Sequence, residues 1–266
     1  MELHRQEWES RQRGHERRVD AWTAGYLSRA SRQESHPVED FLFTYYGHRP
    51  SRLRRWSPGV GVDCLDHPGP QPWREVSDRA RITASWVVDL LTRTAARPAQ
   101  FGCFGLHEWA MVYREQPRHG DWPLRLGSKG TAAVVESQPL RCTHHDAFRF
   151  FTPAARPLNL LQPRREDQAD LEQGGCLHAN MDLYKWSYKL APWVPAELVG
   201  DCFGLAREIR VLDMRASPYD FAALGLAPVP IETADGRAAY AESQRAFAAT
   251  AAVLRARVRA AAEAIC

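Results

Sequence analysis

Residues 174–193, GGCLHANMDLYKWSYKLAPW, give the clearest indication of the fold. In a helix, residues at i, i+4, i+7 and i+11 lie within about 60° of arc on one face. His178, Asp182, Lys185 and Lys189 follow that spacing and would form one charged stripe. Bulky apolar and aromatic side chains flank the stripe on both sides, namely Leu177, Met181, Tyr184, Tyr188, Leu183, Trp186 and Leu190. The stretch therefore predicts a helix that carries charges into an apolar environment.

Such charges need partners, because an unpaired buried charge is very costly. One interpretation is a functional site lined by His178, Asp182 and Lys185. The other is a structural pair, in which Asp182 bonds to Lys185 or Lys189 and the lysine stems pack on apolar surface. Perturbed ionisable groups occur in both settings, so the sequence leaves both interpretations open.

Composition is that of a globular protein, with 266 residues, 44% hydrophobic and 25% charged. The net charge of +3 is well below that of a polybasic nucleic-acid binder. No apolar run approaches the roughly 18 residues of a membrane span, and the charged first residues argue against a signal peptide. The six cysteines are scattered without a C-x-x-C pair, which is typical of reduced thiols. We therefore expect a cytoplasmic protein with no membrane partner.

Apolar periodicity predicts helices over 2–30, 75–96, 195–221 and 235–264, the last at the C-terminus. The helix over 75–96 should bury Ile82, Trp86, Val87, Leu90 and Leu91. Residues 117–150 are richer in Gly and Pro, and TAAVVES (131–137) favours a strand, so we expect a small β or loop insertion there. Residues 160–173 are polar and should form an exposed loop. The predicted fold is mainly α, a single helical domain over 1–266.

A further helix is predicted over 36–47, since Pro37 suits its first position and Gly47 its C-terminal cap. Glu39 would then lie in the first turn, where a carboxylate favours the helix dipole. On the same face as Phe43 and Tyr46, Glu39 would sit among aromatic rings with a raised pKa and could act as an acid or base.

Two more pairs of ionisable residues lie in apolar surroundings. His107 and Glu108 are followed by Trp109, and His144 and Asp146 precede a run of phenylalanines. The default for one buried histidine is a bond to a backbone carbonyl. Mixed His and carboxylate ligands from facing helices, however, are how di-iron and di-manganese sites are built. We expect these pairs to converge with His178 or Asp182, and His107, Glu108, His144, Asp146, His178 and Asp182 are the candidate ligands for Fe or Mn.

Basic residues surround a tryptophan in RPSRLRRWSPGVG (49–61). Arg52, Arg54, Arg55 and Trp56 could contact phosphates and stack on a base. A solvated turn is the alternative. The chain contains no G-x-x-x-x-G-K-[ST], G-x-G-x-x-G, G-x-S-x-G or H-E-x-x-H, so nucleotide-triphosphate hydrolysis, dinucleotide binding and serine-hydrolase chemistry lose support.

Six phrases resemble one family of actinobacterial proteins. They are HPVEDFLFTYY (36–46), GLHEWAMVYR (105–114), RCTHHDAFRFF (141–151), GCLHANMDLYKW (175–186), LDMRASPYD (212–220) and IETADGRAAY (231–240). The family is labelled 3-methyladenine DNA glycosylase, and the resemblance runs from about Trp8 to Val258. It implies a DNA partner and a hydrolase of DNA repair that flips an alkylated purine into an aromatic pocket.

If the chain is such a glycosylase, the candidate catalytic residues are Glu39, Glu108, Asp146, Asp182 and Lys185. Two alternatives stay open. One is a metal-dependent oxygenase or hydrolase acting on a small molecule through the His and carboxylate cluster. The other is a non-catalytic small-molecule binder in which Lys185 and Lys189 face an anion.

Overall fold

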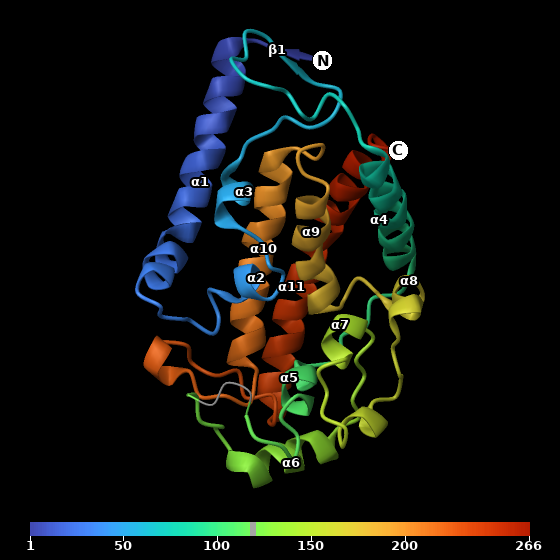
Figure 1. Cartoon of the computed structure of the whole chain (residues 1–266). Coiled ribbons are helices and arrows are strands. Elements are labelled where there is room, and N and C mark those ends of the chain that lie inside the picture. Colours follow the sequence, from blue (N-terminus) through green and yellow to red (C-terminus); the bar gives the residue numbers. More distant parts are fainter. Residues whose placement is uncertain (118–120) are drawn as a thin grey trace. The chain divides into compact units, whose positions relative to one another are not determined.

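A computed structural model describes residues 1–117 and 121–266 (Figure 1). The prediction of a mainly helical fold is confirmed. The helices are α1 Arg5–Ser31, α2 Phe41–Thr44, α3 Pro50–Arg54, α4 Asp78–Ala96, α5 Leu106–Ala110, α6 Gly127–Ser137, α7 His145–Phe148, α8 Gln168–Leu171, α9 Leu177–Lys189, α10 Ala196–Arg215 and α11 Ala234–Glu263. Short 3-10 turns cover Arg156–Leu158, Arg165–Asp167 and Ala222–Leu224, and the strands are β1 Glu2–Leu3 and β2 Asp63–Cys64.

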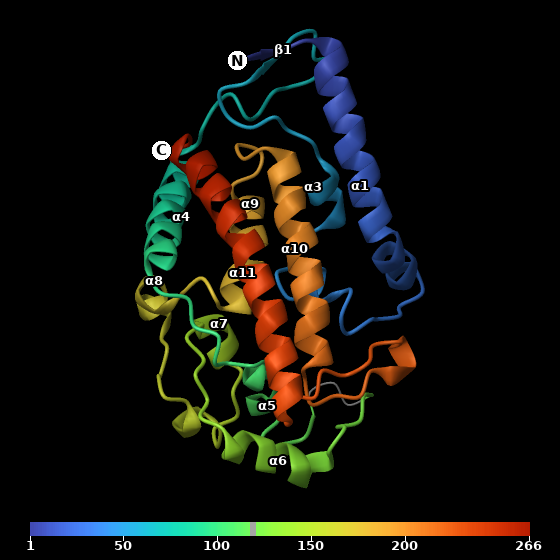
Figure 2. The same ribbon diagram turned by 180° about the vertical axis from the view of Figure 1, so that it is seen from behind.

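The chain divides into two compact units. Unit 1 consists of Met1–Thr92, Met181–Arg207 and Val253–Cys266, and unit 2 of Arg93–Asn180 and Glu208–Ala252. The longest helix, α11, runs unbroken from Ala234 to Glu263 and contributes residues to both units (Figure 2). Its many alanines explain its length, because alanine has the highest helix propensity. One domain over 1–266 stays a prediction.

Unit 1 contains α1 and the parallel pair of β1 and β2, in which Leu3 is opposite Cys64. Trp8, Val19 and Thr23 are buried along α1. On its exposed side, Arg5 and Arg13 each pair with Glu9 at a spacing of four residues. A small aromatic core joins the strands to the rest of the unit and consists of Leu3, Trp8, Trp56, Val62, Cys64, Trp73 and Ala196.

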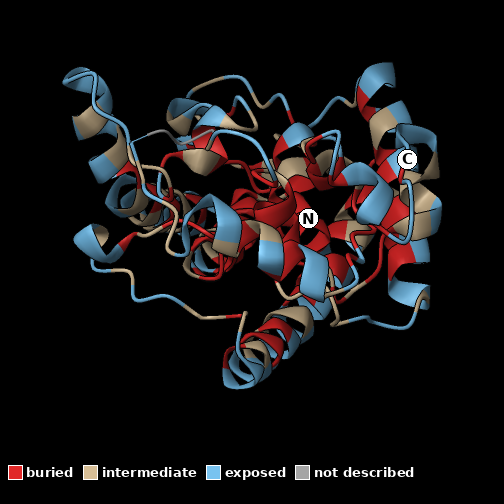
Figure 3. Ribbon diagram, turned by 90° about the horizontal axis from the view of Figure 1, so that it is seen from below, coloured by how far each residue is buried: buried red, intermediate tan, exposed pale blue. Residues whose placement is uncertain are grey.

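Unit 2 contains α5 to α8, the first turn of α9, the end of α10 and most of α11. Its core is apolar, with Trp109, Leu140, Phe151, Ile209 and Tyr240 all buried. Figure 3 colours the buried residues of the chain red. The same interior also holds the buried side chains of His107, His144, His178, Arg210 and Asp213. Unit 2 is therefore where the chain concentrates charged groups in apolar surroundings.

The predicted strand over 131–137 is wrong, because these residues belong to α6. Thr131, Val134 and Val135 are buried at a spacing of i, i+3 and i+4. That helical period outweighs the strand preference of β-branched residues. Residues 118–120 of the expected insertion over 117–150 lie outside the described residues.

Three other expectations need correction. The helix over 36–47 is reduced to α2, with turns on either side. Within α4, Val87, Leu90 and Leu91 are buried as predicted, but Ile82 is 73% exposed and Trp86 39%. The predicted exposed loop over 160–173 includes α8, and its last residues, Glu172 and Gln173, are buried.

Over residues 1–117 and 121–266, no helix has both the length and the apolarity required to cross a membrane.

Candidate functional site

Three histidines of unit 2 come together in its interior. His107 lies on α5, His178 on the first turn of α9, and His144 directly before α7. The ring of His178 is 4.4 Å from the ring of His107 and 5.4 Å from the ring of His144, measured between centroids. All three side chains are buried. Three segments that are far apart in the sequence thus contribute imidazoles to one cluster.

Two glycines allow neighbouring segments of unit 2 to approach each other closely. Gly105 precedes α5 with a φ of +75°, and a Cβ atom there would lie 3.3 Å from the ring of Tyr240. A Cβ atom on Gly175 would overlap the carbonyl oxygen of Gln100. The indole Nε1 of Trp109 donates a hydrogen bond of 2.8 Å to the carbonyl oxygen of Ala216, which fixes α5 against the end of α10.

The contact between His107 and Asp213 is close but poorly aligned for a hydrogen bond. Nε2 of His107 lies 2.9 Å from Oδ1 of Asp213. Among the described residues, neither buried atom has a hydrogen-bond partner of good geometry. The short distance nevertheless lets the Asp213 carboxylate raise the pKa of His107.

The contact of Nδ1, the other ring nitrogen of His107, bears on the tautomer of this imidazole. Nδ1 of His107 lies 3.5 Å from Sγ of Cys103, one turn earlier in the chain. When Nδ1–H donates to this sulfur, the lone pair of Nε2 is left to accept a proton or a metal ion.

Buried charges surround Asp213. Its second carboxylate oxygen, Oδ2, lies 3.4 Å from the guanidinium of Arg210, and Arg210 also lies 3.1 Å from Oε1 of Glu108. Two carboxylates thus share one guanidinium. With neutral imidazoles and both carboxylates ionised, this group carries one excess negative charge, and burial makes such an imbalance costly. A proton on His107 would balance it, and a divalent cation would more than offset it.

The pKa values follow from these charges. Burial lowers the pKa of His107, but the adjacent Asp213 carboxylate outweighs burial and holds that pKa well above its usual value. Burial acts to raise the pKa of Asp213, whereas attraction by His107, His178 and Arg210 brings it well below its usual value. For Glu108, burial raises the pKa and Arg210 only partly opposes this. Without a metal, Asp213 is ionised and His107 carries the balancing proton.

His107, His178 and Asp213 can hold a metal ion. Each offers one ligand atom, and these atoms all lie within 4.8 Å of one another. Neighbouring ligands about 2.1 Å from a metal and 90° apart are roughly 3 Å from each other, which fits the 2.9 Å between His107 and Asp213. Two histidines and one carboxylate are the donor set of non-haem Fe(II) oxygenases. A metal ion at this position would replace the proton on His107.

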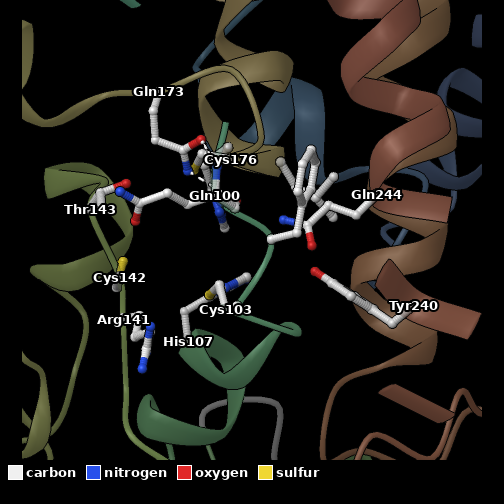
Figure 4. A pocket seen from close by; sticks show the side chains of 14 residues that line it. Gln100, Cys103, His107, Arg141, Cys142, Thr143, Gln173, Cys176, Tyr240 and Gln244 are labelled. Carbon is white, nitrogen blue, oxygen red and sulfur yellow. Dashed lines mark hydrogen bonds between the residues drawn. The ribbon is translucent and has the colours of Figure 1, made fainter. Parts of the chain in front are cut away.

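A cavity of about 260 Å³ opens beside this cluster. His107 and Cys103 reach it from the α5 side, and Tyr240 and Gln244 face it from α11 (Figure 4). Polar side chains line much of the remainder, among them Gln100, Arg141, Thr143 and Gln173. The cavity is of a size to take a small polar molecule rather than a drug-sized one.

A second pair of groups lies next to His178. Nε2 of His144 is 3.3 Å from Oε1 of Glu172, and both side chains are buried. The amide of Gln168 donates a hydrogen bond of 2.6 Å to the same oxygen of Glu172.

Asp182, which belongs to unit 1, is paired with Lys185. Its carboxylate lies 2.9 Å from Nζ of Lys185 and accepts a hydrogen bond of 2.7 Å from the hydroxyl of Tyr46. The expectation that Asp182 is buried and held by Lys185 is confirmed. Lys185 and Lys189 also lie over the ring of Trp186, at 4.6 and 4.8 Å from its centroid.

The aromatic environment predicted for Glu39 is wrong. Its side chain is about half exposed and lies 2.9 Å from a guanidinium nitrogen of Arg29. Asp146 does not share a face with His144, because α7 begins between them and turns Asp146 to a partly exposed position 3.5 Å from Arg149. Glu108 pairs with Arg210 and is not among the described residues whose ligand atoms group together.

The basic run in unit 1 is largely engaged in local contacts. Arg52 donates to the carbonyl oxygens of Tyr188 and Ala191, and its guanidinium lies over the Tyr188 ring. Arg54 pairs with two carboxylates, those of Asp20 and Glu16. Arg55 is exposed beside a cavity of about 440 Å³ that Trp56 also lines. Binding of DNA by these residues stays a prediction.

Asp213, Arg210 and Glu172 were not predicted as site residues. Asp213 stands between Leu212 and Met214 in an apolar stretch that also contains Arg210. That placement was a usable indication of a buried charge. Glu172 gave none, since it lies in a polar stretch.

Comparisons of the chain with protein-family models, with curated proteins and with solved structures gave no match.

Proposed function

We propose that this protein is a metal-dependent enzyme that binds a divalent ion, iron or manganese, through His107, His178 and Asp213. One observation carries the proposal. Nε2 of His107 and Oδ1 of Asp213 lie 2.9 Å apart in a buried site without a well-aligned hydrogen bond, and a ligand atom of His178 is within 4.8 Å of both. A cation between the three groups accounts for this arrangement and for the excess negative charge.

The residues around the ion would orient its ligands. Arg210 holds Oδ2 of Asp213, which leaves Oδ1 to face His107. Nδ1 of His107 lies 3.5 Å from Sγ of Cys103, and donation from Nδ1–H to this sulfur would leave the lone pair of Nε2 for the ion. Partners of this kind typically account for 10- to 100-fold in metal affinity or activity. With three protein ligands, positions remain open for water and a substrate, which is the arrangement of catalytic rather than structural sites.

The cavity beside the cluster would hold a small polar substrate. The amide nitrogen of Gln244 donates to the carbonyl oxygen of Gly175, while its buried oxygen Oε1 has no hydrogen-bond partner. A substrate N–H or O–H could donate to this oxygen, and Arg141 could meet an anionic group. The ion would supply Lewis-acid or redox chemistry, and the donor set matches that of oxygenases.

The test is elemental analysis of untagged protein purified without chelators. We expect tightly bound iron or manganese in the wild type, and its loss in His178→Ala and in Asp213→Asn. His4→Ala is the matched control, because His4 is exposed and lies before α1. Circular dichroism shows whether each variant is folded. Wild-type protein that holds no metal after reconstitution with Fe²⁺ or Mn²⁺ would contradict the proposal.

A second candidate function uses the same residues without a metal. His107 contacts both Cys103 and Asp213, with 3.5 Å from Sγ to Nδ1 and 2.9 Å from Nε2 to Oδ1. In a thiol hydrolase, His107 would take the proton of Cys103 and the thiolate would attack the carbonyl carbon of an amide or ester substrate. The bond from that carbon to the amine or alcohol would break, and the leaving group would depart with the proton from His107. Water would then hydrolyse the thioester, which releases the acid and restores the thiol. This function requires Nε2–H to turn toward Asp213.

Alkylation by iodoacetamide separates the two candidates. A thiol hydrolase predicts fast labelling of Cys103 that slows at least tenfold in His107→Ala but not in His178→Ala. The metal enzyme predicts instead that metal content falls much further in His178→Ala, which loses a ligand, than in Cys103→Ser, which changes only the partner of a ligand. Mass spectrometry locates the label, with the buried Cys142 as an internal reference.

A further inference from the structure

The histidine cluster of unit 2 is larger than one metal site requires. His107, His178 and Asp213 form one donor group. A third imidazole, that of His144, stacks on His178, with the ring centroids 5.4 Å apart and the rings 27° from parallel. His144 is also paired with Glu172 at 3.3 Å. The proposed function leaves this second imidazole–carboxylate pair without a role.

The second pair has the chemistry of a ligand set. Its imidazole and carboxylate are 1% and 2% exposed, so water does not solvate them. The 3.3 Å between Nε2 and Oε1 is close to the roughly 3 Å expected of neighbouring ligands on one ion. Gln168 fixes the carboxylate by donating to Oε1, as the outer partners of metal ligands do.

His178 links the two groups. Its ring packs at 4.4 Å against His107, edge to face, and at 5.4 Å against His144. Ions in two-metal sites lie about 3.5–4 Å apart, so ligand rings of adjacent ions stand as neighbours. The spacing of the three rings is therefore compatible with two adjacent ions that share this cluster.

We propose that the centre is dinuclear, with a second divalent ion held by His144 and Glu172 beside the ion of His107, His178 and Asp213. The proposal rests on the proposed function, because it extends the same centre. Five protein ligands from five segments of unit 2 then serve two ions. Solvent and substrate oxygens would complete the coordination of the second ion. Coordination positions that are open to a substrate are typical of catalytic rather than structural sites.

Metal stoichiometry is the first measurement. Untagged protein is stripped with a chelator, reloaded with Mn²⁺ and desalted, and the bound manganese is counted by inductively coupled plasma mass spectrometry. We expect about two ions per chain in the wild type and about one in Glu172→Gln, which keeps the shape of the side chain. Glu166→Gln is the matched control, since Glu166 is an exposed carboxylate of the same segment and should retain about two.

Electron paramagnetic resonance of the wild type is the second measurement and needs no variant. Two Mn²⁺ ions that share a centre give an exchange-coupled spectrum, whereas a single ion gives the simple six-line pattern. Two coupled ions, reduced to one by Glu172→Gln, would support the dinuclear centre. One uncoupled ion would overturn it and leave the proposed function intact. No bound manganese would overturn both, and two ions that persist in Glu172→Gln would show that the second ion lies elsewhere.

Discussion

At the scale of single residues, one arginine explains how unit 2 tolerates its buried charges. The guanidinium of Arg210 is 2% exposed and lies between the carboxylates of Glu108 and Asp213. A buried ion pair adds little compared with apolar residues of the same volume, but removal of one partner leaves an uncompensated charge. Arg210 is therefore the residue on which the electrostatics of the cluster depends most.

Replacement of Arg210 by methionine should destabilise the protein strongly. Glu108 and Asp213 would lose their shared cation, and we expect the free energy of unfolding to fall by roughly 3–5 kcal/mol. The double variant Arg210→Met with Glu108→Gln should recover part of this loss, because it removes one of the two orphaned charges. Urea unfolding followed by circular dichroism measures both. A loss below about 1 kcal/mol in the single variant would mean that these carboxylates are protonated or hydrated.

Sequence reasoning found some of these residues and missed others for identifiable reasons. The helical spacing of Asp182 and Lys185 shows that they share a face, so their pairing could be predicted. Tyr46, the other partner of Asp182, is 136 residues away, and no local pattern reports that contact. For the same reason, each histidine could be identified as a candidate from its apolar sequence neighbours. Asp213 and Glu172 could be assigned to the site only from the three-dimensional structure.

At the scale of elements, periodicity predicted the long helices and failed on the short ones. Helices α1, α4, α9, α10 and α11 follow the expected ranges within a few residues at most ends. They are long enough for a repeated apolar face to show. Segments such as α5 and α7 have four or five residues, too few for a period, and their positions depend on tertiary contacts.

A contact between α9 and the segment before α3 should make unit 1 sensitive to acid. The ring of His48 stacks on Tyr188 at 3.7 Å, and burial, with further contributions from Arg52 and Lys189, lowers the pKa of His48 to about 3. Asp182 opposes this lowering and Lys185 adds to it. In the unfolded chain the pKa returns to about 6.5.

Between about pH 6.5 and pH 3, the unfolded state therefore binds a proton that the folded state does not. Stability is complete above this window and falls with decreasing pH by up to about 1.4 kcal/mol per pH unit. His48→Phe keeps the stacked ring and cannot take up a proton, so its unfolding free energy should decline less steeply from pH 6.5 to pH 4. Equal slopes in the two proteins would show that His48 is protonated in the folded state.

At the scale of the whole molecule, the DNA interpretation depends on the resemblance and on the basic run of unit 1. Arg54 already pairs with Asp20 and Glu16, and the net charge of the chain is only +3. If the protein binds DNA, Arg55→Gln should weaken the salt dependence by about one unit of slope for the lost phosphate contact. Fluorescence anisotropy with a duplex that carries an abasic-site analogue measures this. No affinity at low salt would count against a glycosylase.

The metal interpretation depends instead on three buried side chains, and their positions can be observed directly. Crystals of untagged protein reloaded with Mn²⁺ or Fe²⁺ should show an anomalous-difference peak roughly 2.0–2.3 Å from Nε2 of His107, Oδ1 of Asp213 and a ring nitrogen of His178. We predict that peak, with Nδ1 of His107 still directed at Cys103. A site without anomalous density, in which Nε2–H of His107 donates a straight hydrogen bond to Asp213, would contradict the account.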